Sequence, residues 1–210
     1  MTSMRTIDKI LKYSVRTSTG RGPAGGFTYG LPFSLQTPIH TLFQVSTSGA
    51  LVAGVYSGAV SVQSLLKHGD FGLGTFANLD GEMVVLDGHV YQVQGTGHVS
   101  EAPSTARAPF AVVTKFAPNT DLEIGPITNF SELQRRCGAL RTSGNIFYAL
   151  RLDGMFKRIR TRAVNRPEAG TRLVDAAKAQ SEFCFTEVSE TLLGLWSPGF
   201  SSAFSVAGYH

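Results

Sequence analysis

The chain has 210 residues, a formal net charge of +4, and a composition that is 42% hydrophobic and only 16% charged. This length suits one domain or two small ones, and 23 glycines with low charge indicate short strands joined by tight turns, which argues against a coiled coil, a solenoid or wholesale disorder. No apolar run approaches the roughly 20 residues of a membrane span, so no membrane partner is expected.

Residues 1–38 differ from the rest of the chain in charge. They carry five basic residues against the single acid Asp8, and a Gly/Pro-rich run follows over residues 20–26. The stretch lacks the apolar core of a secretory signal, whereas its acid-poor, Ser/Thr-rich composition is also typical of a mitochondrial presequence. We expect a flexible basic leader over residues 1–38, with mitochondrial import as the alternative, and a folded domain over residues 39–210.

Short strands and helices follow from about residue 39. Residues 40–45 predict a strand, and residues 61–68 predict a short helix with Ser61 as its N-cap. Two Asp-Gly pairs predict hairpins, because a two-residue hairpin turn needs positive φ at both central positions. The predicted hairpins span residues 82–93, around Asp87-Gly88, and residues 145–164, around Asp153-Gly154.

A longer helix is predicted over residues 129–140. It starts with the capping box Asn129-x-x-Glu132 and places its apolar residues on one stripe. Cys137 lies on that stripe, which favours a buried core thiol over a nucleophile. With Cys184 it makes too few cysteines for a disulfide scaffold or a cysteine-based zinc site.

The chain ends in further short elements. Because hairpins dominate and no βαβ repeat is visible, the predicted fold class is α+β, with mixed, mostly antiparallel sheets and short helices. The remaining predicted elements are a weaker helix over residues 171–181 and strands over residues 191–196 and 203–210, around a turn at Ser197-Pro198-Gly199.

Several features have both a chemical and a plain structural interpretation. The glycines of residues 69–76 lack the strand–helix context of a nucleotide-binding loop, so we interpret them as close backbone passage beside a sheet. Glu82 shares a strand face with Val84 and Leu86, and lies either at the rim or partly desolvated in a position suited to acid–base work. Phe156, Arg158, Arg160, Arg162 and Val164 alternate onto one strand face, which is either solvated or able to bind a carboxylate or nucleic acid.

A set of motifs in chain order resembles the α-acetolactate decarboxylase family. The resemblance runs from about residue 41 to the last residue and includes G-T-F, L-D-G-E, T-R-A-V and G-Y-H. It implies a cytoplasmic, usually homodimeric zinc enzyme of two small sheet-containing subdomains, which converts 2-acetolactate to (R)-acetoin and carbon dioxide in acetoin and butanediol biosynthesis. The matching segments are residues 46–58, 68–76, 79–88, 109–114, 145–154, 161–164 and 206–210.

The resemblance also implies roles for four residues. His210 corresponds to the first zinc ligand, Glu82 and Arg162 to active-site residues, and Thr75 to a residue of the same pocket. In the family, two more histidines follow the first, and this chain stops at His210. We therefore expect a C-terminally truncated domain with an incomplete zinc site, little bound metal and little turnover, because one imidazole does not hold zinc usefully.

Two other functions are weighed against the decarboxylase. The first is a metal-free, non-catalytic family member that acts as a binding or interaction protein. The second is a small basic nucleic-acid binder that uses the face of Arg158–Arg162. The second is disfavoured, because no aromatic platform accompanies the arginines, and we expect no nucleic-acid partner.

Overall fold

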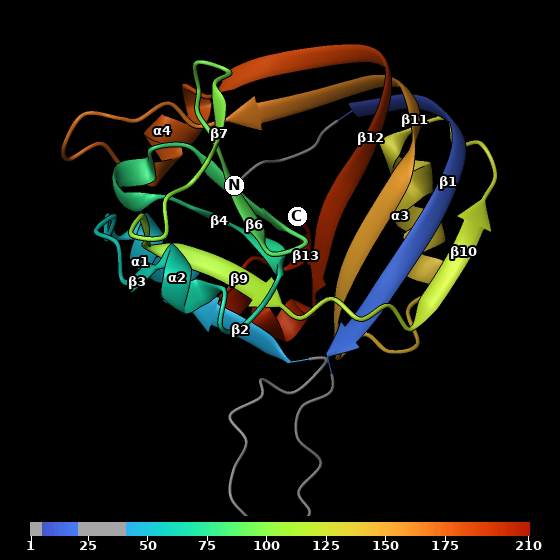
Figure 1. Ribbon diagram of the computed structural model, residues 1–210, viewed down its shortest axis with the longest axis horizontal. Helices are drawn as coiled ribbons and strands as arrows, with labels where there is room; N and C mark the ends of the chain where they lie inside the picture. Colours follow the sequence, from blue (N-terminus) through green and yellow to red (C-terminus); the bar gives the residue numbers. More distant parts are fainter. Residues whose placement is uncertain (1–5, 21–40) are drawn as a thin grey trace, which may run out of the picture.

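The computed structural model describes residues 41–210 and the backbone of residues 6–20. Two antiparallel sheets dominate these residues, which confirms the predicted α+β class (Figure 1). None of the helices in the described residues is long and apolar enough to cross a membrane. Those helices are α1 (Ser48–Val52), α2 (Val62–Leu65), α3 (Phe130–Ala139) and α4 (Leu173–Lys178), with 3-10 turns η1 (Ala77–Leu79) and η2 (Gly199–Ala203).

The strands form a five-stranded and a six-stranded sheet, with a small pair beside them. The five-stranded sheet has the order β10 (Thr120–Ile124), β1 (Thr6–Gly20), β11 (Phe147–Ala163), β12 (Ser181–Ser197), β13 (Gly208–Tyr209). The six-stranded sheet has the order β2 (Leu42–Val45), β9 (Phe110–Thr114), β4 (Phe71–Thr75), β5 (Glu82–Leu86), β6 (His89–Val93), β7 (Val99–Glu101). The pair is β3 (Val60–Ser61) with β8 (Arg107–Ala108).

Strand β9, the second strand of the six-stranded sheet, shows how the sheets pack. All five of its residues are buried. Phe110 and Val112 join a cluster that also holds Ala149 and Leu195 of the five-stranded sheet, so one face of β9 looks toward that sheet. Alternate residues such as Val113 join the core on the opposite face, as the two-residue period of a strand requires.

The glycines of β4 allow close passage, as the sequence predicted. A Cβ on Gly72 would lie 2.1 Å from the carbonyl oxygen of Val112, and one on Gly74 would lie 2.6 Å from that of Phe110. No side chain fits at either position without moving β9.

Helix α3 forms where its capping box predicts it. The side-chain oxygen of Asn129 accepts a hydrogen bond from the Glu132 amide at 2.9 Å, and the Glu132 carboxylate accepts one from the Thr128 amide at 3.0 Å. Cys137 packs with Leu133 against the five-stranded sheet, which confirms it as a core residue. Its burial raises the pKa of Cys137 to about 11, so the thiol is neutral at physiological pH.

The two Asp-Gly pairs have different outcomes. Asp87 and Gly88 take φ values of 52° and 82° and turn β5 into β6, which confirms the first hairpin. The second hairpin is wrong, because Asp153 and Gly154 lie inside the continuous strand β11. There they pair with Thr191 and Glu190 of β12 on one side and with β1 on the other.

Residues 6–20 differ from the flexible leader that their charge suggested. They form β1, which pairs with β10 and β11. The stretch contains six β-branched residues, mostly Thr and Ile, and this β-propensity favours a strand despite the basic residues. The rest of the expected leader, residues 1–5 and 21–38, lies outside the described residues, as does His40.

The ends of other predicted elements also differ. The weak helix is only α4, and the strand expected from residue 191 is the end of β12, which starts at Ser181. The strand expected over residues 203–210 is reduced to β13, because η2 extends to Ala203 and residues 204–207 form a turn and irregular backbone. Phe156 does not share a face with Arg158: its ring is buried with Ile159 against α3, because the pairing of β11 with both neighbours is interrupted at Lys157.

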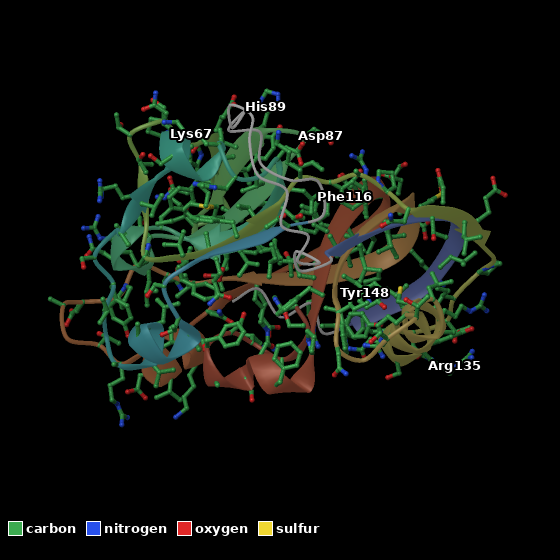
Figure 2. The ribbon with its side chains drawn as sticks, turned by 90° about the horizontal axis from the view of Figure 1, so that it is seen from below. Lys67, Asp87, His89, Phe116, Arg135 and Tyr148 are labelled. Carbon is green, nitrogen blue, oxygen red and sulfur yellow. The ribbon has the colours of Figure 1, made fainter. Side chains whose placement is uncertain are left out.

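Strands β11 and β12, with 17 residues each, cross the molecule as an arch. Strand β11 runs from the side of α3 over to the side that holds the six-stranded sheet, and β12 returns antiparallel to it (Figure 1). In the view from below, Arg135 and Tyr148 lie with α3, whereas Lys67 and His89 lie with the six-stranded sheet (Figure 2). The arch therefore spans the space between the two halves.

Candidate active site

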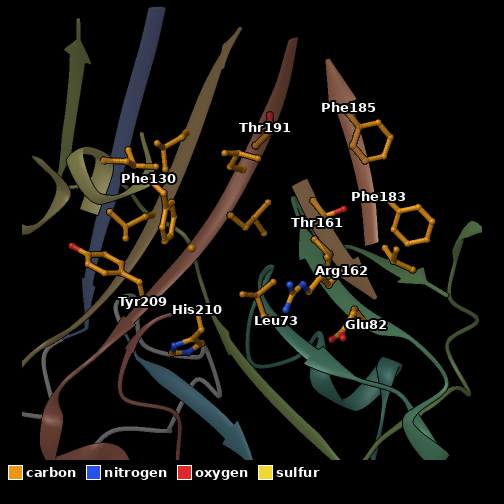
Figure 3. A pocket seen from close by; sticks show the side chains of 18 of the residues that line it. Leu73, Glu82, Phe130, Thr161, Arg162, Phe183, Phe185, Thr191, Tyr209 and His210 are labelled. Carbon is orange, nitrogen blue, oxygen red and sulfur yellow. The ribbon is translucent and has the colours of Figure 1, made fainter. Parts of the chain in front are cut away.

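Two adjoining cavities of about 610 and 600 Å³ lie under this arch. Such volumes are typical of small-molecule sites. The cavities are neighbours that share part of their walls. The shared residues are Leu73, Glu82, Arg162, Val206 and His210, and Figure 3 shows His210 on one side of Leu73 with Arg162 and Glu82 on the other.

Glu82 is the first residue of β5 and is buried, with 3% of its surface exposed. The rim alternative is therefore wrong. Its neighbour Met83 points to the opposite face and into the core of the six-stranded sheet. One carboxylate oxygen of Glu82, Oε1, accepts a hydrogen bond from the Val164 amide at 3.3 Å, which ties this side chain to the end of β11.

Thr75 is the residue of β4 that pairs directly with Glu82. It is buried and lines the second cavity. Its hydroxyl donates a hydrogen bond to the carbonyl oxygen of Gly81 at 2.8 Å, immediately before Glu82. Thr75 thus fixes the backbone from which the Glu82 side chain projects.

Arg162 lies near the end of β11, directly opposite Glu182 of β12. The two side chains form an ion pair, and the guanidinium of Arg162 extends into the cavity (Figure 3). Arg158 and Arg160, on the same strand, line neither cavity. The arrangement therefore selects Arg162 from the arginine row as the cation available to a bound ligand.

His210 follows β13 and is held by its backbone. Its N–H donates to the carbonyl oxygen of Leu195 at 3.0 Å, and its own carbonyl oxygen accepts from the Leu195 amide at 2.7 Å. Burial lowers the pKa of His210, which favours the neutral imidazole. Its buried Nδ1 has no hydrogen-bond partner among the described residues, a situation that suits a metal ligand.

The rest of the cavity wall was not predicted. Glu182, which pairs with Arg162 but lines neither cavity, was also missed, because the predicted helix over residues 171–181 left residue 182 outside any element; a strand starting at residue 181 would have put it opposite Arg162. The first cavity continues along a largely apolar wall. Its apolar side chains include Phe130, Leu133, Leu150, Leu152, Phe183, Phe185 and Leu192.

Comparison with known proteins identifies the family. Residues 42–210 match the sequence profile of the family described as Alpha-acetolactate decarboxylase. The chain belongs to this family. The α-acetolactate decarboxylase of Methylococcus capsulatus is 41% identical over 81% of this chain and 66% of its own length. That of Methanosarcina mazei is 41% identical over 80% of this chain and 59% of its own length.

A known structure of the family matches the fold. The crystal structure of α-acetolactate decarboxylase from Bacillus subtilis strain 168 superposes with a TM-score of 0.77 and 35% identity. The match covers 80% of this chain and 73% of that one. The chain thus spans two thirds or less of the two curated relatives above and about three quarters of this structure.

Proposed function

We propose that this chain provides the substrate site of an α-acetolactate decarboxylase, which converts 2-acetolactate to (R)-acetoin and carbon dioxide in acetoin and butanediol biosynthesis. The observation that carries the proposal is the convergence of Glu82, Arg162 and His210, from three distant parts of the chain, on one cavity. As in the family resemblance, we propose a cytoplasmic homodimer with a small-molecule substrate.

Arg162 binds the substrate carboxylate in this proposal. A guanidinium makes two parallel, charge-assisted hydrogen bonds to a carboxylate, which fixes the plane of that group. In 2-acetolactate the bond to this carboxylate breaks, its electron pair moves toward the adjacent ketone to give an enediolate, and carbon dioxide leaves. Orienting the breaking bond perpendicular to the plane of the ketone lets the electron pair delocalise as it forms.

Glu82 handles the proton that completes the reaction. After carbon dioxide leaves, the enediolate carbon takes up a proton to become the new C–H of acetoin. A buried carboxyl group fixed by the Val164 amide can hold that proton at one face of the carbon. Delivery from one face only would yield a single enantiomer, and Thr75 keeps the Glu82 backbone in place.

Zinc is the proposed cofactor, with His210 as one ligand. When bound, a zinc ion supplies a Lewis acid that stabilises negative charge on a substrate oxygen. The unpartnered Nδ1 of His210 suits such a ligand. However, the described residues contain no group of three His, Cys, Asp or Glu side chains that could hold a metal ion. They supply one ligand and not a complete site, so the steps above use only the side chains of this chain.

The proposal is tested by assaying the purified chain with 2-acetolactate, with and without added zinc, for carbon dioxide and acetoin, and by measuring its metal content. Binding of 2-hydroxyisobutyrate, an unreactive carboxylate with a tertiary hydroxyl, is followed in parallel by NMR titration. Arg162→Met should weaken binding of this probe roughly 100-fold, because two charge-assisted hydrogen bonds are lost. Arg158→Met, on the same strand and outside both cavities, should change it less than about twofold.

The outcomes separate the two remaining functions. Acetoin formation that depends on Arg162 supports the decarboxylase. Probe binding without bound zinc and without acetoin formation supports the non-catalytic, metal-free binding protein. Equal probe binding by wild type and Arg162→Met would overturn the assignment of the carboxylate site.

A further inference from the structure

Strand β5 is attached to β11 at both of its ends. At its start, Glu82 accepts the hydrogen bond from the Val164 amide at 3.3 Å. Just past its end, both carboxylate oxygens of Asp87 lie 3.0 Å from Nη1 of Arg151. The five residue-to-residue steps from Glu82 to Asp87 span roughly 17 Å, whereas the thirteen steps from Arg151 to Val164 span roughly 43 Å when extended. Strand β11 therefore has to arch between the two attachments, as Figure 1 shows.

Arg162 lies on this arch, two residues before the Val164 attachment. Its position over the cavity depends on where both ends of the arch are held. The attachment at Glu82 belongs to the proposed active site itself. The attachment at Arg151 lies outside both cavities and has no role in the chemistry proposed above.

Arg151 is the centre of a polar network that reaches the cavity wall. Its Nε donates to the two oxygens of Asp153 at 3.1 and 3.2 Å. The Thr191 hydroxyl donates to the same carboxylate at 2.5 Å, and Thr191 lines the first cavity. Burial alone would lower the pKa of Arg151, but the hydrogen bonds to Asp153 and Asp87 raise it, so the guanidinium stays charged.

The turn that carries Asp87 is itself anchored in the six-stranded sheet. The Gly88 amide donates to the carbonyl oxygen of Asp70 at 3.0 Å. Asp70 in turn bonds to the Thr114 carbonyl oxygen through its amide, at 3.1 Å, and to the Phe116 amide through its carboxylate, at 2.8 Å. The Arg151–Asp87 pair therefore connects β11 to the six-stranded sheet itself, because the turn of Asp87 is hydrogen-bonded to that sheet.

From this geometry we infer that Arg151 is a positioning residue: by bridging Asp87 and Asp153 it fixes the spacing of the two sheets, and thereby places Arg162 beside Glu82 at the cavity. The inference rests on the proposed carboxylate site. A plain surface ion pair is the alternative, because the Asp87 side chain is 64% exposed and such pairs contribute about 0–1 kcal/mol. The two differ in what they change: a surface pair affects only stability, whereas a positioning residue affects ligand affinity in the folded chain.

The test combines Arg151→Met, Asp87→Asn and the double variant. Asn is tolerated at the positive φ of Asp87, so the turn is retained. The control is Arg136→Met, which breaks the ion pair with Glu132 within α3. Neither Arg136 nor Glu132 lines a cavity. Affinity for 2-hydroxyisobutyrate is measured well below the unfolding temperature, and hydrogen exchange is followed over residues 155–163.

We expect each single variant to weaken binding of the probe about tenfold. The double variant should lose no more affinity than Arg151→Met alone, because the effect of Asp87→Asn acts only through the Arg151–Asp87 pair, which Arg151→Met already removes. Arg136→Met should stay within about twofold, Arg151→Lys should restore part of the affinity, and exchange over residues 155–163 should accelerate in Arg151→Met. Unchanged affinity in Arg151→Met, or additive losses in the double variant, would overturn the inference.

Failure of the proposed function gives a different result. In that case the wild-type chain does not bind the probe at all. Hydrogen exchange over residues 155–163, which needs no ligand, then still tests whether Arg151 holds β11 in place. Exchange over residues 155–163 that stays at the wild-type rate in Arg151→Met then overturns the positioning role.

Discussion

Asp87-Gly88 and Asp153-Gly154 are the same dipeptide between similar β-rich runs, yet one turns the chain and the other continues a strand. Asp87 and Gly88 adopt positive φ, and the flanking strands pair with each other. Asp153 and Gly154 each have partners on both sides, in β1 and in β12.

The difference lies in what is available to pair with each segment. A hairpin at Asp153-Gly154 would fold β11 on itself and leave β1 and β12 without their common partner. The continuous strand satisfies backbone hydrogen bonds along both edges over most of its length, which outweighs a local turn preference. A turn signal therefore decides the structure only where no longer pairing competes with it.

The difference between the two Asp-Gly pairs is tested most directly by replacing Gly88 and Gly154, separately, with alanine. Gly88 has a φ of +82° and open space where a Cβ would lie, so Gly88→Ala carries a purely conformational cost of roughly 1–2 kcal/mol in the free energy of unfolding. Gly154 does not have positive φ, so Gly154→Ala should be neutral or stabilise by about 0.5–1 kcal/mol, as alanine does in a strand interior. Urea unfolding at constant m-value measures both.

Equal destabilisation by the two variants would contradict the comparison. It would mean that Gly154 also needs a conformation that only glycine takes easily, as a turn would require.

Local sequence signals predicted much of the fold. The capping box of α3, the N-cap at Ser61 and the first hairpin each depend on residues that are close in sequence, and all are confirmed. The errors are non-local. The length of β11 and the early start of β12 both depend on pairing between segments far apart, which one sequence does not reveal.

The candidate site divides in the same way. The family motifs selected Glu82, Thr75, Arg162 and His210, and the structure places all four at the two cavities, although their chemical roles stay predictions. Partners such as Glu182 belong to no such motif. They become neighbours of the site only through strand register, so the sequence alone missed them.

A smaller effect on the free energy of unfolding is expected at the N-cap of α3, a local sequence signal with which no long-range strand pairing competes. Asn129→Ala removes the side-chain acceptor of the Glu132 amide and should cost about 1 kcal/mol in the free energy of unfolding. Asn129→Asp keeps an acceptor at the same place and should cost much less. If the two variants unfold at the same urea concentration, packing and not the cap determines where α3 begins.

The smallest expected effect is the pH dependence of the same cap. Hydrogen bonds from the Thr128 amide, the Arg136 guanidinium and the Thr128 hydroxyl lower the pKa of Glu132 from 4.5 to about 2. A carboxyl whose pKa is lowered by folding stabilises the folded state above its unfolded pKa, and this contribution is lost as pH falls from about 4.5 to about 2. Glu132→Gln keeps a capping side chain without the charge. The difference in unfolding free energy between wild type and Glu132→Gln should therefore be constant above pH 5 and shrink steadily below pH 4.5. In the Arg136→Met background the effect of Glu132→Gln should be smaller at every pH, because one of the hydrogen bonds that lower this pKa is gone. A difference that persists unchanged at pH 2 would show that Glu132 acts through the shape of its side chain, and that its charge adds nothing to the start of α3.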